Sequence, residues 1–137
     1  MPTVMMEERR MRQRYRPDRE SCVQVRRDMR AFLDRCQVDA DAAADALLIA
    51  NELACNAVDH AHTPFSLTAT LTPGSLRIEL TDGSAEEPRL QPHDTAAVRG
   101  RGLQMVAHLS SRWSFRRHGG GKTVVADVVL PAMNVSA

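Results

Sequence analysis

The sequence lacks several features that would assign it to a class at once. Its 18 basic and 17 acidic side chains leave a formal net charge of only +1, which gives no general indication of nucleic-acid binding. Its three cysteines are odd in number and form no CxxC pair, so neither a disulfide framework nor a thiolate zinc site is expected, and a reducing cytoplasm is favoured. No apolar run approaches the ~20 residues needed to span a membrane, and the first residues lack the apolar core of a signal peptide.

Several motifs are missing as well. The sequence has no GxxxxGK[ST] and no GxGxxG following a strand, which excludes a P-loop and leaves a dinucleotide fold unsupported. His60 and His62 are two residues apart on a predicted helix and point about 200° apart, so metal ligation by this pair is disfavoured. No serine lies in a nucleophile motif, and acyl transfer is set aside. What remains is a chain of 137 residues, 43% of them hydrophobic, which is typical of one domain.

Two stretches have the apolar periodicity of helices. Residues 19–36 place apolar side chains at helical intervals among arginines, whose cluster is best explained as a solvated face. Residues 46–62 carry a stripe of Leu and Ala that would bury against a sheet. Asp39 or Asp41 would cap the start of this central helix, which we expect to continue to about His60 before Thr63 and Pro64 end it.

Alternating patterns predict strands. They lie at 65–71, 76–82, 113–115 and 123–130, with a short edge strand near 13–15 and a third helical pattern from Leu103 to Leu109. Because neighbouring strands joined by short turns are antiparallel, we expect an α/β fold: a two-layer sandwich with a mixed, mostly antiparallel sheet covered on one face by helices. The domain would comprise residues 15–131, with a flexible tail at 1–14 and another at 132–137.

Glu52 and Asn56 are the first candidates for chemistry. They are four residues apart on the central helix, about 40° around its axis, so the two side chains stack on one rim. A carboxylate can orient or deprotonate a nucleophile, and a neutral amide oxygen can ligate Mg²⁺. The same pattern is also compatible with a partly solvated glutamate and an ordinary asparagine.

Two further places offer polar groups for a ligand. Asp82 ends an apolar strand just before Gly83, where its carboxylate would accept a hydrogen bond from an exocyclic amine such as that of adenine, or would simply begin a turn. Gly100 to Gly102 open a helix whose free N–H groups would bind phosphate, with Arg99 and Arg101 adding charge. A flexible turn explains this GxG equally well.

The loop and the last strand complete the candidate site. Residues 85–99, a proline-containing segment without periodicity, have the length of a lid or binding loop. Thr123 begins the last strand, where its hydroxyl would support the Asp82 carboxylate or contact the base.

In order along the chain, these pieces resemble a known family. E-L-A-C-N-A-V-x-H-A from Glu52, D-G at Asp82, G-R-G-L from Gly100 and G-K-T-V-V from Gly121 closely resemble the Bergerat-type ATP-binding domain shared by gyrase, histidine kinases and mismatch-repair ATPases. Within it, the short length and the N-A-V-x-H-A and G-K-T-V segments are similar to bacterial anti-sigma factor serine/threonine kinases. The resemblance covers roughly residues 15–131.

The resemblance implies a role for each motif. Asn56 would ligate Mg²⁺, and Glu52 would be the base or the carboxylate that orients the nucleophile. Asp82 would read adenine, with Gly83 and Thr123 beside it. The segment that wraps the ATP phosphates would consist of Gly100, Arg101, Gly102 and Leu103, with Arg99 before it. The sequence departs from larger members in lacking the extended DxGxG at Asp82 and in having a short lid.

The implied activity is phosphorylation of a serine or threonine on an anti-anti-sigma (STAS-type) partner, combined with regulation of a sigma factor. The resemblance implies no direct contact with nucleic acid or membrane, and it is compatible with a homodimer because relatives often dimerise. An alternative is a nucleotide-binding interaction module without kinase activity. A detached histidine-kinase catalytic domain is disfavoured because no phosphoacceptor helix pair precedes the motifs.

Overall fold

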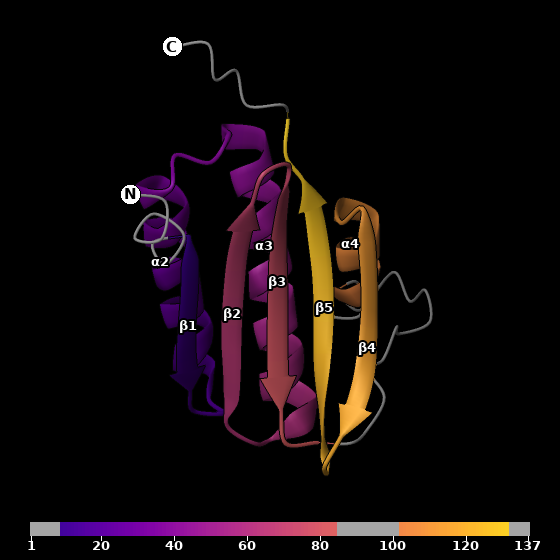
Figure 1. Ribbon diagram of the computed structural model, residues 1–137. Coiled ribbons are helices and arrows are strands. Elements are labelled where there is room, and N and C mark those ends of the chain that lie inside the picture. The colour runs from indigo at the N-terminus through magenta and orange to yellow at the C-terminus, as the bar shows by residue number, and fades with distance from the viewer. Residues whose placement is uncertain (1–8, 85–101, 132–137) are drawn as a thin grey trace.

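The described residues form one antiparallel sheet with helices on one side. The computed structural model describes residues 9–84 and 102–131. Its strands are β1 (Arg10–Tyr15), β2 (Phe65–Thr72), β3 (Ser75–Asp82), β4 (Arg112–His118) and β5 (Gly121–Val129), in the spatial order β1-β2-β3-β5-β4. Every neighbouring pair is antiparallel, and Figure 1 shows the helices packed behind the sheet. The expected two-layer α/β sandwich is confirmed, with a sheet that is antiparallel throughout its described strands.

The helices form where the apolar periodicity predicts them. Helix α2 (Arg19–Arg35) begins after Asp18, whose side chain accepts a hydrogen bond from the backbone N–H of Ser21, and α3 (Ala40–Asn56) begins after Asp39, which caps Ala42 in the same way. The third helix is α4 (Gly102–Leu109). None of the helices within 9–84 and 102–131 is both long and apolar enough to cross a lipid bilayer.

The core lies between the sheet and the helices. One face of the β2–β3 hairpin is buried, as its alternation predicts, and faces the buried stripes of α2 and α3. These buried residues are Phe65, Leu67, Ala69, Leu71, Leu76, Ile78 and Leu80 on the strands, and Val25, Met29, Phe32, Leu33, Ala46, Ile49, Ala50, Leu53 and Ala54 on the helices. The opposite face of the sheet is polar and carries serine, threonine and arginine side chains. The burial pattern explains why helices cover only one side.

The edge strand is longer than the sequence suggests. It pairs with β2 from Arg10 to Tyr15, so it begins three residues before the predicted edge strand at 13–15, within the segment 1–14 expected to be a tail. Tyr15 fixes this strand because its ring stacks on Phe65 and its hydroxyl donates a 2.7 Å hydrogen bond to Asp28 of α2. Burial, followed by the bond to Asp28, raises the pKa of Tyr15. The arginine-rich strand has too few apolar residues to be predicted with its full length.

Candidate functional site

The end of α3 presents the carboxylate and the amide that the sequence singles out. Glu52 and Asn56 are both half-buried and lie one turn apart at the C-terminal end of the helix. Burial raises the pKa of Glu52, while a hydrogen bond with Asn51 acts in the opposite direction. Within the described part of the chain, no hydrogen bond engages the Asn56 carboxamide. Its oxygen is therefore available to a ligand, and a raised pKa suits a proton acceptor.

A change of helix type follows Asn56 at once. Residues Ala57–Ala61 form a π-helical turn, closed by a hydrogen bond from the His62 N–H to the Ala57 carbonyl, and His62 then takes a left-handed conformation with φ 55°. The central helix thus continues to Ala61, about as far as predicted, but with a wider last turn. Single π turns often occur at functional sites, because they redirect the residues beside them.

Asp82, at the end of β3, lies in a buried ion pair. Its two carboxylate oxygens are 3.1 and 3.0 Å from the ammonium nitrogen of Lys122 on β5, and the side chains of Lys122 and Asp82 are only 4% and 2% exposed. The backbone N–H of Ser84 donates a further hydrogen bond of 2.8 Å to Asp82 Oδ1. A carboxylate has about four lone-pair sites. These contacts occupy three of them, and one lone pair on Oδ2 has no partner among the described residues.

Lys122 lies within the G-K-T-V-V segment, although no role is predicted for it there. It is the only lysine in a chain that otherwise carries arginine at its basic positions. An ammonium is a compact charge on a flexible stem, whereas the planar guanidinium of arginine needs a wider space. The sequence thus contains a signal for this residue: a single lysine at the start of a buried strand suggests that it pairs with a specific acidic side chain.

Thr123 does not make one of the two contacts expected of it, the contact with Asp82. The cross-strand pairs are Asp82 with Lys122 and Thr81 with Thr123, and successive side chains of a strand point to opposite faces. The Thr123 hydroxyl lies 2.8 Å from both the Thr81 hydroxyl and His118 Nε2, on the face away from the helices. The expected contact between Thr123 and Asp82 is therefore wrong, and Lys122 occupies that position.

Close backbone packing holds the Asp82 turn in place. Gly83 donates its backbone N–H to the Thr63 hydroxyl at 2.8 Å, which ties the end of β3 to the segment after the π-helical turn. On the other side, a side chain at Gly121 would overlap the carbonyl oxygen of Asp82. Only glycine fits there. Gly121 is thus a second supporting residue that lies beside the predicted ones.

The start of α4 faces the same end of the sheet. Gly102 is the first residue of this helix, as predicted, and Val106 anchors it in the core. The helix ends beside Ser111, whose N–H bonds to the Asp127 carbonyl near the far end of β5. Its N-terminus therefore points towards the end where Asn56 and Asp82 lie. Arg99, Gly100, Arg101 and the lid at 85–99 fall outside the described residues, as does the side chain of Leu103.

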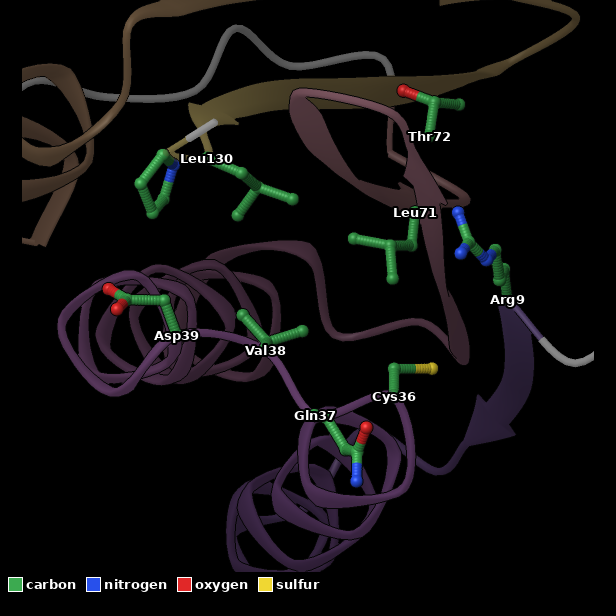
Figure 2. A pocket seen from close by; sticks show the side chains of 9 residues that line it. Arg9, Cys36, Gln37, Val38, Asp39, Leu71, Thr72 and Leu130 are labelled. Carbon is green, nitrogen blue, oxygen red and sulfur yellow. The ribbon is translucent and has the colours of Figure 1, made fainter. Parts of the chain in front are cut away.

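A different pocket lies at the opposite end of the molecule. It has a volume of about 230 Å³ and is lined by the α2–α3 turn, the β2–β3 hairpin and the segment after β5. Figure 2 shows Cys36, Val38 and Leu71 around this space. The pocket is lined by Val38 and Asp39, just before the first residue of α3, whereas Asn56 is the last residue of that helix. It is therefore separate from the candidate site.

Comparisons with known proteins identify related domains and structures. The family model described as histidine kinase-like ATPase domain matches residues 15–127. The fold resembles the RsbU and RsbW domains of Rv1364c from Mycobacterium tuberculosis, with a TM-score of 0.69 and 20% identity over 90% of this chain and 33% of that chain. It also resembles the SiaB-SiaC complex from Pseudomonas aeruginosa, with a TM-score of 0.67 and 16% identity over 93% of this chain and 95% of that chain.

Identities of 16–20% establish a shared fold only. The present chain spans about a third of the length of the Rv1364c structure. No curated protein sequence matches it.

Proposed function

Because the chain belongs to the histidine kinase-like ATPase domain family, we propose that it binds Mg-ATP where α3 and β3 end. We propose further that it phosphorylates a serine or threonine of an anti-anti-sigma partner and regulates a sigma factor. The observation that carries the nucleotide site is the gathering of Asn56, Asp82 and the start of α4 at one end of the molecule. Family membership implies ATP as the ligand. The kinase activity and the protein partners rest on the motif resemblance.

The donor set fits a magnesium nucleotide. Mg²⁺ prefers oxygen ligands and keeps several of its waters, so one protein oxygen beside the phosphates is sufficient. The Asn56 carboxamide, which no described side chain engages, would supply it. The N-terminus of α4 at Gly102 would receive phosphate oxygens through its free N–H groups. Arg99, Gly100, Arg101 and Leu103 belong to this proposed phosphate segment.

The Asp82–Lys122 pair would recognise the base. The remaining lone pair on Asp82 Oδ2 would accept a hydrogen bond from the exocyclic amine of adenine, and Gly83 would let the base approach closely. Lys122 acts as a positioning residue, because its two contacts fix the carboxylate and balance its charge in a buried place. Guanine presents an oxygen where adenine has its amine. We therefore expect ATP to bind more tightly than GTP.

Glu52 would act on the acceptor hydroxyl. It is one helical turn from Asn56, and its raised pKa makes it a stronger base than an exposed glutamate. Bound Mg-ATP supplies the transferable phosphoryl group and the charge of the metal, and positioning supplies most of the rate in such transfers. Orienting the serine or threonine hydroxyl and accepting its proton is the task left to the protein.

Two variants separate binding from transfer. Asn56→Ala is expected to lower Mg-ATP affinity at least about 10-fold, because it removes a metal ligand, whereas Glu52→Ala is expected to bind ATP normally and to lose phosphoryl transfer. Calorimetric titration gives the affinities, and labelled ATP with candidate anti-anti-sigma proteins gives the transfer. Asn51→Ala is the matched control for the binding measurement alone: Asn51 lies on the same helix and accepts a hydrogen bond from Arg26, but it also bonds to Glu52.

The outcomes distinguish the proposals. Unimpaired binding by Asn56→Ala would remove Asn56 from the metal site, and equal affinity for ATP and GTP would remove Asp82 from base reading. If the wild-type chain binds ATP and modifies no partner, with Glu52→Ala indistinguishable from it, the function is that of a nucleotide-binding interaction module. Gel filtration of the ATP-bound chain measures whether it dimerises.

A further inference from the structure

Two cysteines from different helices face each other beside the candidate site. Cys22 of α2 and Cys55 of α3 have their sulfur atoms 3.4 Å apart, and both are free thiols. Disulfides join residues whose Cα atoms are usually 4.4–6.8 Å apart, and sulfur atoms in contact are within a small movement of the ~2.05 Å bond length. Cys55 directly precedes Asn56. The pair therefore connects α2 to the part of α3 that carries the candidate ligand.

A small reagent has access to the pair. Both cysteines line a pocket of about 160 Å³. The other residues around it are Arg19, Val23, Arg26, Val58 and Asp59. Three of these, Arg19, Val23 and Arg26, are exposed, so the pocket opens to solvent. A water molecule takes up about 30 Å³ of the liquid, and this space admits a molecule as small as a hydroperoxide.

We propose that Cys22 and Cys55 form a modification site at which a hydroperoxide converts the two thiols into an intramolecular disulfide. One sulfur attacks the peroxide as a thiolate, which breaks the O–O bond and gives a sulfenic acid and, after proton transfer, a molecule of water or alcohol. The second sulfur then attacks the sulfenic sulfur. The S–S bond forms, the S–O bond breaks and water leaves. The peroxide gains two electrons, and the two thiols lose them.

The third cysteine provides an internal comparison. Cys36 lies fourteen residues beyond Cys22 at the end of the same helix, about 21 Å away at 1.5 Å per residue, and it lines the pocket at the opposite end (Figure 2). That separation is too large for a disulfide with Cys22. Because Cys55 touches Cys22, Cys36 is too far from Cys55 as well. Within one folded chain, only the pair Cys22–Cys55 can form.

The disulfide would alter the neighbouring helix end. Forming the bond brings the two sulfur atoms together by roughly 1.3 Å, and the pull acts on α3 between Glu52 and Asn56. Displacements of about 1 Å at a site are costly. This consequence rests on the proposed nucleotide site, whereas the modification itself does not. We expect the oxidised chain to bind Mg-ATP more weakly, and a thiol reductant to restore the affinity.

The experiment uses the full chain and needs no variant for its main result. Reduced protein is incubated with hydrogen peroxide, and its thiols are counted with Ellman's reagent. We expect the count to fall from three to one, with the intact mass lower by two hydrogen atoms and a peptide map joining the Cys22 and Cys55 peptides. Burial raises the pKa of Cys55 to about 12, which lowers the fraction of reactive thiolate and slows its oxidation. The measured quantity is therefore the product at the end of the reaction, not the rate.

Variants then test the assignment. Cys36→Ser should still form the cross-link, whereas Cys22→Ser and Cys55→Ser should not, with folding of each confirmed by circular dichroism. Loss of Cys36 alone, a sulfinic product without a cross-link, or only intermolecular dimers would overturn the proposal. If the cross-link forms and Mg-ATP affinity is unchanged, the site stands and its effect on the nucleotide does not. If the reduced chain binds no ATP, the proposed function fails, and the disulfide result is unaffected.

Discussion

Replacing Lys122 by methionine tests the buried ion pair most directly. The change keeps the length of the side chain and removes the only cation within hydrogen-bond distance of the Asp82 carboxylate in the described residues. Breaking a buried pair by removing one partner costs about 3–5 kcal/mol, because it leaves an uncompensated charge out of water. Domains of this size have total stabilities of about 5–15 kcal/mol. The variant should therefore lose a large share of its stability, with Tm lower by about 10–17 °C.

An exposed pair on the same strands supplies the control. Arg77 of β3 and Asp127 of β5 make a two-contact ion pair at 2.9 and 3.1 Å, but their side chains are 52% and 14% exposed, against 4% and 2% for Lys122 and Asp82. Ion pairs at the surface contribute about 0–1 kcal/mol. Arg77→Met should therefore change stability far less than Lys122→Met, although the distances in the two pairs are nearly the same.

The measurement is urea unfolding followed by fluorescence. Trp113 is the only tryptophan and packs against the core, so its emission reports loss of the fold. An unchanged m-value shows that the variants and the wild type expose the same surface area on unfolding. In the double variant Asp82→Asn with Lys122→Met, no buried charge is left, and the loss should be smaller than the sum of the single losses by at least about 2 kcal/mol. A cost below about 1 kcal/mol for Lys122→Met would show that water reaches the carboxylate, and the reasoning would be wrong.

Two further predictions concern the same end of the sheet. Gly121→Ala should cost about 1–3 kcal/mol of stability and weaken ATP binding, because the new Cβ would overlap the Asp82 carbonyl oxygen. Gly120→Ala is the control: Gly120 has open space around it but a φ of +88°, so this variant should lose stability and keep its ATP binding. Burial raises the pKa of Glu52, so the folded state binds this proton more tightly than the unfolded state does. The protonated carboxyl is therefore compatible with the fold at low pH, and stability is lost as the pH rises through the raised pKa and the buried group becomes charged. Glu52→Gln should therefore have a higher Tm than wild type near pH 7, with the difference disappearing towards about pH 4, and an equal Tm at every pH would contradict this origin of the shift.

The sequence was sufficient for the layers of the fold because its main elements have one buried face. The β2–β3 hairpin alternates strictly, and α2 carries apolar residues at helical spacing, so period and burial agree. The strand β1 was predicted only in part, since Arg10 to Tyr15 includes just two apolar side chains, Met11 and Tyr15. The π-helical turn after Asn56 was not predicted, because its residues fit the pattern of an ordinary helix.

The motifs place Asn56, Asp82 and the start of α4 in one candidate site, but they do not show which residue of β5 lies beside Asp82. The first part of β5 is buried on both faces, with Lys122, Thr123 and Val124 all buried, so its sequence lacks the alternation that would show which side each residue takes. A motif match then cannot separate two neighbouring positions. Because the side-chain period of a strand is two, an error of one residue moves a side chain to the opposite face. Lys122 therefore lies opposite Asp82, and Thr123 lies on the other face of the sheet.

The C-terminal end of α3 lies between two groups of contacts, one with the sheet and one with α2. They differ in the chemistry that can change them. On the sheet, the Asp82–Lys122 pair and the Gly83–Thr63 hydrogen bond fix the strand end against the chain that follows α3. On the helix layer, the Cys22 and Cys55 sulfurs are in contact and can be oxidised. An oxidant leaves an ion pair unchanged, whereas it converts two neighbouring thiols into a disulfide. If this end binds a nucleotide, its sheet side therefore sets which base is accepted, and its α2 side offers a means of adjusting how tightly it is held.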